Sequence, residues 1–356
     1  MSTGLPGVCV FPANFRLGFD QPCFYAKIQS VPGIKITAPA KLNLHLSVGE
    51  RRPDGFHDIE SLFLALDFGD TVLVETQAEG NLNATEICMD WRLPGGTGIP
   101  TEKNIVTRAV SLFRSRTGYD AALRVAVEKR IPLGGGLGGG SSDAAATLLA
   151  LNRLAQLDRG DLLDLETLAE MGAELGSDVP FFVSGIAAGF AAAWVSGRGE
   201  RILPIALPRE VQDLSILLVN PGFHSDTAGA FRSLDRHRLA TSLCRPCGQG
   251  VSLDTLPGVF ASQPKDWPFF NDFMPAFAGQ EENSDFYKSW LAYNEIISCL
   301  KTLGADFAGL SGSGSTCFGV FSQKNMAKHA KKLLSKRWAY IFEAFACTGD
   351  NVMLKY

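Results

Sequence analysis

The stretch with the clearest chemical meaning runs from Ile131 to Ala146 and reads IPLGGGLGGGSSDAAA, with glycine at six of the seven positions from Gly134 to Gly140. Glycine has no Cβ atom, so its backbone can adopt positive φ and approach a ligand closely. A helix that begins just after the glycines would direct unpaired N–H groups and the positive end of its dipole at that ligand. The pattern therefore predicts a phosphate site. A flexible linker is the alternative, but linkers are not normally entered from a strand and left by an apolar helix.

Two common nucleotide motifs can be compared with this loop. The segment 134–139 matches the dinucleotide pattern G-x-G-x-x-G, and Asp158 lies about 20 residues further on. A glycine run satisfies that pattern by chance, and Pro132 stands between strand and loop. The Walker A pattern fails, because no lysine precedes Ser141 and Ser142. A nucleoside triphosphate would be held mainly by backbone N–H groups and these two hydroxyls, one of which could reach Mg²⁺.

Two charged residues outside the loop could take part in phosphoryl transfer, which needs positioning, charge stabilisation and a group that takes the acceptor's proton. Asp178 follows a Gly-Ser break at the end of an expected helix and precedes an apolar segment, so we expect it to be partly buried and to act as the base. Lys41 could favour the ionised carboxylate or stabilise the transferring group. The structural alternatives are a helix cap for Asp178 and an ordinary surface lysine for Lys41.

Length and composition favour a folded protein with two domains. The 356 residues carry a net charge of −4, with 46% hydrophobic and 20% charged residues, as in ordinary globular proteins. This weak negative charge gives no general attraction to nucleic acid or to an anionic membrane, and the apolar runs are too short to span a bilayer. We expect a cytoplasmic protein that is a monomer or a homodimer.

The cysteines and the N-terminus carry little functional information. Eight dispersed cysteines do not form a disulfide framework. Cys244 and Cys247 make a single C-x-x-C pair, for which we favour a loop turned by proline over a zinc site or a redox dithiol. Residues 1–33 contain four prolines and no secretory signal pattern, so we treat them as an N-terminal extension of unknown role.

Hydrophobic periodicity predicts mixed strands and helices without regular βαβ alternation, and hence an α+β protein. The sequence from Arg52 to Gly55 predicts a turn, residues 309–319 form a second turn rich in glycine and serine, and residues 236–268 form a looser insert. We expect strands over 41–48, 56–66, 71–75, 123–129, 216–219 and 341–346, and helices over 104–117, 142–157, 164–175, 290–303 and 326–338.

Five segments resemble, in their order along the chain, the GHMP kinase superfamily, which includes galactokinase and homoserine, mevalonate and phosphomevalonate kinases. The glycine motifs are shared across the superfamily. The Lys-Leu-Asn, Asp-Gly-Phe-His and Gly-Ser-Asp-Val-Pro-Phe-Phe segments are similar to those of members acting on a cytidine-diphosphate-linked methylerythritol in the non-mevalonate isoprenoid pathway. The resemblance covers about residues 34–356, and its segments are 39–44 (PAKLNL), 53–57 (PDGFH), 132–142 (PLGGGLGGGSS), 176–182 (GSDVPFF) and 311–315 (SGSGS).

The resemblance implies a kinase with the two-domain α+β architecture of the GHMP superfamily. Residues 34–208 would form the ATP-binding N-terminal domain, a mixed or antiparallel sheet with helices, like a domain known from a ribosomal protein. Residues 209–356 would form a C-terminal α+β sandwich. The enzyme would use ATP and Mg²⁺ to phosphorylate the 2-hydroxyl of the cytidine-diphosphate-linked sugar alcohol, giving the 2-phosphate and ADP.

The resemblance also implies roles for single residues. Asp178 would be the general base, Lys41 its charged partner, and Asn43 a contact near the reacting hydroxyl. Ser142 is assigned to Mg²⁺. The other ATP-binding residues would be Lys103, Asn104, Pro132, Leu133, Gly134, Gly135, Gly136, Leu137, Gly138, Gly139, Gly140 and Ser141, and further substrate-binding residues would be Ser311, Gly312 and Ser313.

The same resemblance implies a cytosine site. Phe56 would stack on one face of the base in place of the family's usual tyrosine, since stacking needs only a π-face. His57 would read the edge of the base, because its ring nitrogens can donate and accept; the alternative is a strand histidine satisfied by the backbone. Phe231 would close the other face, with core packing as its alternative, and Thr227 would touch the diphosphate.

Two further features depart from the family pattern. The family usually has asparagine at the position of Asp143, and a carboxylate beside a triphosphate is unfavourable, so we expect Asp143 to face away from the phosphate, where it also favours the helix dipole. The insert is longer than the family predicts and has no assigned role, although residues 271–273 (NDF) after it resemble a family segment.

Three classes of function remain open at this point. The first is the small-molecule kinase, with a homoserine or mevalonate type of substrate as the alternative acceptor. The second is a nicotinamide-dependent oxidoreductase that uses the same glycines. The third is a catalytically silent sensor on a kinase fold, which the presence of both Lys41 and Asp178 argues against.

Overall fold

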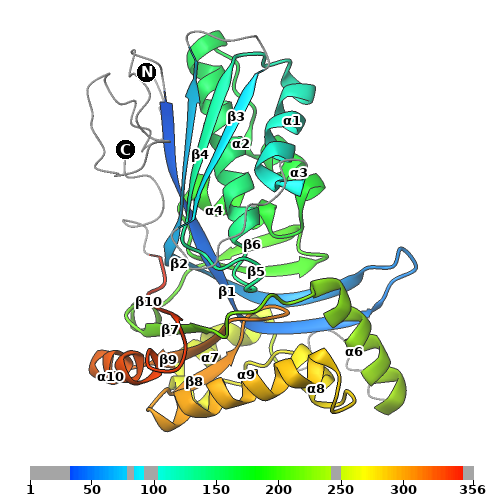
Figure 1. Ribbon diagram of the computed structural model, residues 1–356, viewed down its shortest axis with the longest axis vertical. Helices are drawn as coiled ribbons and strands as arrows, with labels where there is room; N and C mark the ends of the chain where they lie inside the picture. The colour runs from blue at the N-terminus through cyan, green and yellow to red at the C-terminus, as the bar shows by residue number, and fades with distance from the viewer. Residues whose placement is uncertain (1–32, 78–83, 92–102, 242–249, 348–356) are drawn as a thin grey trace.

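The computed structural model describes residues 33–77, 84–91, 103–241 and 250–347. Within these ranges the chain forms two β-sheets with helices packed on them (Figure 1), which is the predicted α+β class. No helix in the described ranges is long and apolar enough to cross a membrane. The pair Cys244 and Cys247 and nearly all of the N-terminal extension lie outside the described residues.

The first sheet is mixed, as predicted. It has the order β3-β4-β2-β5-β6, with β1 paired to β2, and only β3 and β4 of its described strands run parallel. Its strands are β1 (Gly33–Arg51), β2 (His57–Thr76), β3 (Thr85–Trp91), β4 (Leu123–Lys129), β5 (Ala192–Gly197) and β6 (Arg201–Ile205).

The two strands expected over 56–66 and 71–75 are in fact one strand, β2, which pairs with β1 on both sides of a register shift at residues 66–68. The prediction was wrong because Gly69 interrupts the apolar pattern. A Cβ atom at Gly69 would lie 2.4 Å from the carbonyl oxygen of Ala38. The glycine therefore marks the close approach of β1 and not the end of a strand.

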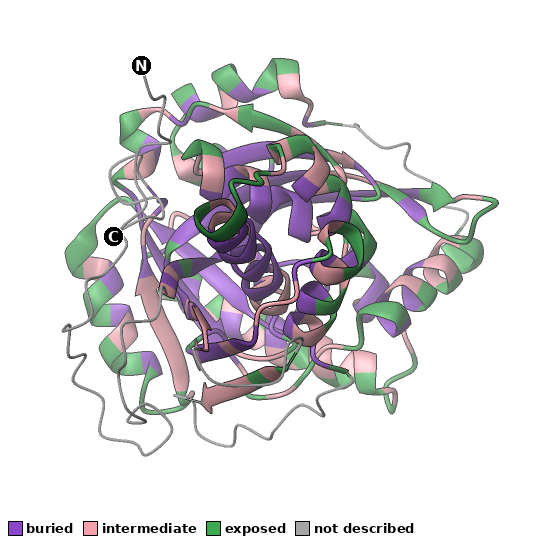
Figure 2. Ribbon diagram, turned by 90° about the horizontal axis from the view of Figure 1, so that it is seen from above, coloured by how far each residue is buried: buried purple, intermediate pink, exposed green. Residues whose placement is uncertain are grey.

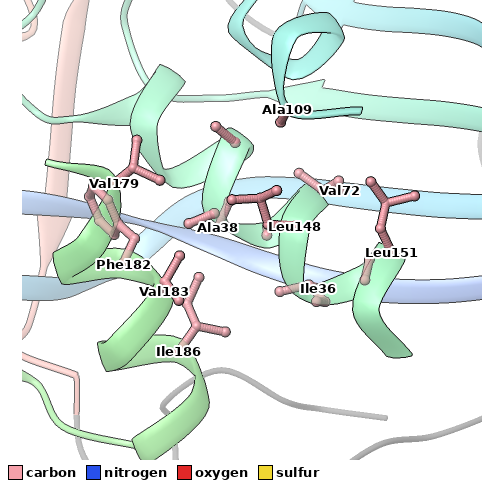
Figure 3. Close-up of a cluster of buried hydrophobic side chains, with 14 of the residues drawn as sticks. Ile36, Ala38, Val72, Ala109, Leu148, Leu151, Val179, Phe182, Val183 and Ile186 are labelled. Carbon is pink, nitrogen blue, oxygen red and sulfur yellow. The ribbon is translucent and has the colours of Figure 1, made fainter. Parts of the chain in front are cut away.

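Four helices share one apolar core with this sheet, and α2, which contacts both the sheet and the other three helices, lies at their centre. Helix α2 is rich in buried alanine and contacts β1, β2, α1, α3 and α4. Figure 3 shows side chains of α2 and α4 (Leu148, Leu151, Phe182 and Ile186 among them) meeting Ile36 and other residues of the sheet. The helices are α1 (Ile105–Thr117), α2 (Gly139–Arg159), α3 (Leu165–Leu175) and α4 (Val179–Ala188).

Helix α2 begins within the glycine run, three residues before the expected position. Gly138, with φ of 69°, is its N-cap, and the N–H of Ser142 donates to the carbonyl of Gly138 at 2.9 Å to close the first turn. Helices α3 and α4 follow before the next strand, β5, which is antiparallel to β2. Both β4 and β5 are antiparallel to β2, which lies between them, so the helices connect two non-adjacent strands of a largely antiparallel sheet. The dinucleotide-binding interpretation therefore loses its structural context, which is a doubly wound parallel sheet.

The second sheet is antiparallel with the order β10-β7-β9-β8. The boundary that we propose between residues 208 and 209 falls between the two sheets. The strands are β7 (Ser215–Asn220), β8 (Phe307–Leu310), β9 (Cys317–Phe321) and β10 (Tyr340–Ala344), and the helices are α5 (Arg209–Gln212), α6 (Thr227–Thr241), α7 (Leu256–Ala261), α8 (Phe273–Ala278), α9 (Asp285–Thr302) and α10 (Lys324–Leu334), with short 3₁₀ turns at Leu253–Thr255 and Pro264–Asp266.

A shared apolar core joins the two sheets. One cluster of buried side chains includes Leu62 and Trp194 from the first sheet together with Leu218 and Phe318 from the second. Figure 2 shows the buried residues gathered at the centre of the molecule. The described part of the insert also contributes buried side chains, such as Trp267, to this cluster. The expectation of a loose insert was wrong for this part, because its aromatic residues are covered on folding.

Candidate active site

A cavity of about 1000 Å³ lies where the glycine loop, the β1–β2 hairpin and α6 meet. Most of the residues that we predict for the site from the sequence line this cavity, although they come from distant parts of the chain. The predicted residues that line it are Lys41, Asn43, Phe56, His57, Pro132, Leu133, Gly134, Gly135, Gly136, Leu137, Gly138, Gly139, Gly140, Ser141, Asp178, Thr227, Phe231, Gly312 and Ser313.

The glycine loop is fixed through its carbonyl groups. The carbonyl oxygens of residues 134–137 accept hydrogen bonds, in order, from the N–H of Ser225 (3.1 Å), the N–H of Thr316 (3.0 Å), the hydroxyl of Ser311 (2.9 Å) and the N–H of Lys41 (2.9 Å). Among the described residues, no protein group accepts from the backbone N–H groups of residues 134–141. These N–H groups, at the start of α2, are therefore available to an anion.

Two of the glycines are required by close packing. Gly136 has φ of 73°, and a Cβ atom there would lie 2.3 Å from the carbonyl oxygen of Ser311. At Gly138 a Cβ atom would lie 2.9 Å from Cγ of Lys41 and from the ring of Phe182. Any side chain at either position would displace the second glycine turn or the lysine.

Lys41 and Asp178 meet at the wall of the cavity. The Nζ atom of Lys41 lies 3.4 Å from Oδ2 of Asp178 and 4.6 Å from the ring centroid of Phe63. The side chain of Lys41 is only 5% exposed, so it is not a surface lysine. Asp178 occupies the N-cap position of α4, but its side chain makes no capping hydrogen bond. Both structural alternatives therefore fail, and Asp178 is partly buried as expected.

Asn43 is held beside Lys41 by three contacts. Its Oδ1 accepts a hydrogen bond of 2.5 Å from Lys41 Nζ, and its Nδ2 donates to the hydroxyl of Ser61 at 2.9 Å. Its backbone N–H donates to the hydroxyl of Ser311 at 3.2 Å. Because Ser311 also binds Gly136, Asn43 and the glycine loop share one anchor on the second glycine turn.

The other end of the cavity is aromatic. Phe56 is 55% exposed, and the guanidinium of Arg198 lies 5.2 Å from its ring centroid. The ring of His57 stacks on that of Phe231 at 5.0 Å, and its Nε2 lies 2.8 Å from Oδ1 of Asp235. The histidine is therefore paired with a carboxylate and not with the backbone. Phe231 also packs on the C-terminal core.

Some predicted residues do not line the cavity. Ser142 is buried, and its hydroxyl has no hydrogen-bond partner among the described residues, whereas Ser141 lies on the wall. Asn104 caps α1 through its side chain, which accepts from the N–H of Val106, and Lys103 is exposed beside it. Ser311 is buried and contacts the cavity wall through its hydrogen bonds with Asn43 and Gly136.

Thr227 does line the cavity, and its hydroxyl lies 2.9 Å from that of Ser313.

A buried charge cluster lies beneath the loop. Lys129 donates to Asp70 and, at 2.6 Å, to Oδ2 of Asp143. Asp70 also accepts from the backbone N–H of Arg130 at 2.5 Å and of Ile131 at 2.8 Å, where β4 leads into the loop. Burial, together with the neighbouring Asp70 and against the effect of Lys129, raises the pKa of Asp143 to about 8. Asp143 does not line the cavity, in agreement with the expectation that it faces away from phosphate.

Several residues of the wall were missed by sequence reasoning. Lys129, at the end of the strand before the loop, could have been found from its position in the sequence. Asp235 lies four residues after Phe231 on α6, the spacing that places two side chains on one face of a helix. The others that carry charge are Arg51, Glu174, Arg198, Glu200 and Arg232; they reach the wall through folding and carry no local sequence signal.

The Asn-Asp segment after the insert has a positioning role in the structure. The side-chain amide of Asn271 donates to the carbonyl oxygens of Leu310 and Gly312, each at 2.8 Å. The Oδ2 atom of Asp272 accepts from the N–H of Val48 at 2.9 Å and from Arg238 at 3.2 Å. The segment thus ties the second glycine turn and α6 to β1.

Comparison with known proteins bears on the identity of this site. The sequence pattern described as "GHMP kinases N terminal domain" matches residues 104–186, and that described as "GHMP kinases C terminal" matches residues 274–339. A 4-diphosphocytidyl-2-C-methyl-D-erythritol kinase of Xanthomonas axonopodis pv. citri is 36% identical over 293 residues, which cover 82% of this chain and 84% of the relative. A kinase of the same name from Treponema pallidum subsp. pallidum is 36% identical, with coverages of 88% and 99%.

Solved structures give the same result for the fold. The crystal structure of a 4-(cytidine 5'-diphospho)-2C-methyl-D-erythritol kinase superposes with a TM-score of 0.63 and 29% identity, covering 87% of this chain and 98% of that one. A homoserine kinase from Cytophaga hutchinsonii superposes with a TM-score of 0.60 at 16% identity, covering 94% of this chain and 99% of that one, and shows the fold alone.

The packing at Gly136 gives a prediction about stability. We expect Gly136→Ala to lower the free energy of unfolding by about 3 kcal/mol or more, because the substitution adds a clash to the strain of positive φ. Gly118→Ala is the matched control, since Gly118 has a similar φ of 67° but no atom within 4 Å of a Cβ; it should cost only about 1 kcal/mol. Urea denaturation measures both, and equal losses would show that the contact with Ser311 is unimportant.

The buried carboxyl of Asp143 gives a prediction about pH. Its pKa is raised to about 8 in the folded chain, so between pH 4 and 8 the folded state holds a proton that the unfolded state has released. The contribution of this group to stability therefore falls as pH rises, by at most about 1.4 kcal/mol per pH unit. The stability of Asp143→Asn should therefore vary less with pH. Between pH 5 and pH 8 its free energy of unfolding should rise relative to that of the native chain.

Unfolding in urea at several pH values measures this effect. Asp158→Asn, on the same helix with a side chain that is 56% exposed, is the control and should retain the native dependence. An Asp143→Asn variant whose stability varies with pH as steeply as that of the native chain would contradict the assignment of the proton.

Proposed function

This chain belongs to the 4-diphosphocytidyl-2-C-methyl-D-erythritol kinases, a family of GHMP kinases, and we propose that it transfers a phosphoryl group from ATP to the 2-hydroxyl of that substrate. The products are the 2-phosphate and ADP, in the non-mevalonate route to isoprenoid precursors. The observation that carries the proposal is the Lys41–Asp178 pair, at 3.4 Å, on the wall of the cavity that the glycine loop also lines.

The phosphates of ATP bind at the glycine loop in this proposal. Its support is the set of free N–H groups over residues 134–141, the positive end of the α2 dipole, and the absence of Cβ atoms where the backbone must come close. Mg²⁺ bound with the nucleotide would neutralise charge on the phosphates. Of the serine pair, Ser141 supplies the hydroxyl that faces the cavity, while the buried Ser142 supports the first turn of α2.

Asp178 acts as the general base and accepts the proton of the 2-hydroxyl. Its carboxylate is partly exposed to the cavity, and Lys41 beside it supplies a positive charge that stays in place through two further contacts, with Asn43 and Phe63. A fixed cation at this point stabilises both the ionised base and the charge that develops on the transferring group. Asn43 orients the substrate near this pair.

The cytidine end of the substrate binds at the aromatic end of the cavity. Phe56 presents an exposed ring that can stack on a base, and His57 presents its edge. Phe231 closes this end, and Thr227 with Ser313 faces the diphosphate. Arg198 and Arg232 also line this region and place positive charge where the diphosphate has negative charge.

Removal of the base tests the mechanism. Asp178→Asn should lower kcat by about 10²- to 10⁴-fold, while the dissociation constants of ATP and of the cytidine-diphosphate-linked substrate change by no more than about 3-fold, because the amide keeps the shape of the side chain. Coupled measurement of ADP release gives kcat, and calorimetry gives the constants. Asp158→Asn is the control; turnover near the native rate in Asp178→Asn would refute the assignment.

The aromatic end makes a separate prediction. Cytidine diphosphate should inhibit competitively against the sugar-alcohol substrate and not against ATP. Phe56→Ala should raise KM for that substrate by roughly 5- to 150-fold, the range expected for loss of one base stack, with KM for ATP unchanged. Leu162→Ala, at another exposed apolar side chain, is the control. Phosphorylation of homoserine or mevalonate with no inhibition by cytidine diphosphate would contradict the proposed acceptor.

A further inference from the structure

His57 has one ring nitrogen that is engaged and one that is free. Its Nε2 lies 2.8 Å from Oδ1 of Asp235, and no hydrogen bond to its Nδ1 is found among the described residues. An ionised carboxylate can only accept hydrogen bonds, so Nε2 must carry the proton. In a neutral imidazole the other nitrogen is then an acceptor. The pair therefore defines which tautomer lines the cavity.

Several contacts hold Asp235 in place opposite His57. Asp235 lies one helical turn after Phe231 on α6, so both side chains lie on the same face, and Phe231 stacks on the imidazole. Arg238, on the same helix, donates to the carbonyl oxygens of Gly49 at 2.7 Å and of Val48 at 2.5 Å. Figure 1 shows α6 beside the far end of the β1–β2 hairpin. The helix is thus clamped to the hairpin that carries His57.

We propose that Asp235 is a specificity-determining residue, which fixes His57 as a hydrogen-bond acceptor at Nδ1 and so makes the cavity select a pyrimidine with an exocyclic amino group over one with a keto oxygen. The inference rests on the proposed function, because it concerns the base of a cytidine-diphosphate-linked substrate. Asp235 acts through His57 and is a positioning residue for the base.

The chemistry of the two bases explains the selection. Cytosine carries an amino group that donates to an acceptor such as Nδ1, whereas uracil carries a carbonyl oxygen at the same ring position. With uracil bound, Nδ1 of His57 and the carbonyl oxygen would both be acceptors, so both would lose water without gaining a hydrogen bond. Sites built to bind a polar group strongly reject analogues that lack it for this reason. Without the carboxylate, His57 can exchange its tautomer and donate from Nδ1 to a keto group, so the discrimination should fall.

Steady-state kinetics of the full chain test this inference, with the cytidine-diphosphate-linked methylerythritol and its uridine-diphosphate analogue as acceptors. Asp235→Asn should lower the ratio of kcat/KM values, cytidine over uridine, by about 10-fold or more. The change should come from KM, with kcat within about 3-fold, because Lys41 and Asp178 are untouched. Asp213→Asn, whose side chain is 67% exposed, should keep the native ratio. An unchanged ratio in a folded Asp235→Asn would overturn the inference.

The tautomer can also be measured in the native chain, which does not require a folded variant. Nitrogen-15 chemical shifts of the His57 ring, assigned with the help of His57→Gln, should show a protonated Nε2 and an unprotonated Nδ1. The opposite tautomer would overturn the inference. Failure of the proposed function can be told apart from failure of this inference. A native chain that does not phosphorylate the cytidine-linked substrate refutes the proposed function. If the native chain does phosphorylate it, but Asp235→Asn leaves the ratio of kcat/KM values unchanged, only the role of Asp235 is refuted.

Discussion

The seating of the glycine loop against the second glycine turn is the constraint on which the rest of the site depends. Buried backbone carbonyls need hydrogen-bond partners, and those of residues 134–137 find them in three other segments of the chain, two of them in the second glycine turn. With the carbonyls engaged by protein, the N–H groups at the start of α2 are left for an anion. This arrangement is possible only because Gly136 has no Cβ atom, which would clash with the carbonyl of Ser311.

Strand β1 links the glycine loop to the pair of Lys41 and Asp178. The backbone N–H of Lys41 donates to the carbonyl of Leu137, and its side chain reaches Asp178 and Asn43. The glycine loop, as the proposed phosphate site, and Asp178, as the proposed base, are therefore positioned relative to each other through a single residue. Phosphoryl transfer depends mainly on positioning and on fixed charge, so this rigidity matters more than any covalent chemistry. The buried cluster of Lys129, Asp70 and Asp143 fixes the end of β4, just before the loop, through hydrogen bonds. Burying these charges costs desolvation energy.

The aromatic end of the cavity uses α6 in addition to the β1–β2 hairpin of the first sheet. The pair Lys41 and Asp178 belongs to the first sheet and its helices, whereas Phe231 and Asp235 come from α6, after the first strand of the second sheet. The apolar core shared by both sheets and the clamp of α6 on the hairpin bring the ends together. The proposed phosphoryl transfer and the proposed recognition of cytosine therefore depend on different residues, which are joined by these contacts.

The sequence by itself determined the local elements and the chemical types. Period-2 and period-3.6 patterns predicted β4 and α1 to within a residue, and the glycine run, Lys41 and Asp178 were found from residue type and neighbours. The continuity of β2 through Gly69, the earlier start of α2, the choice of Ser141 over Ser142 for the cavity wall, and the pairing of His57 with Asp235 were decided only by tertiary structure. These features depend on backbone approach and on side chains up to 178 residues apart, and such long-range contacts leave no periodic or local signal in the chain.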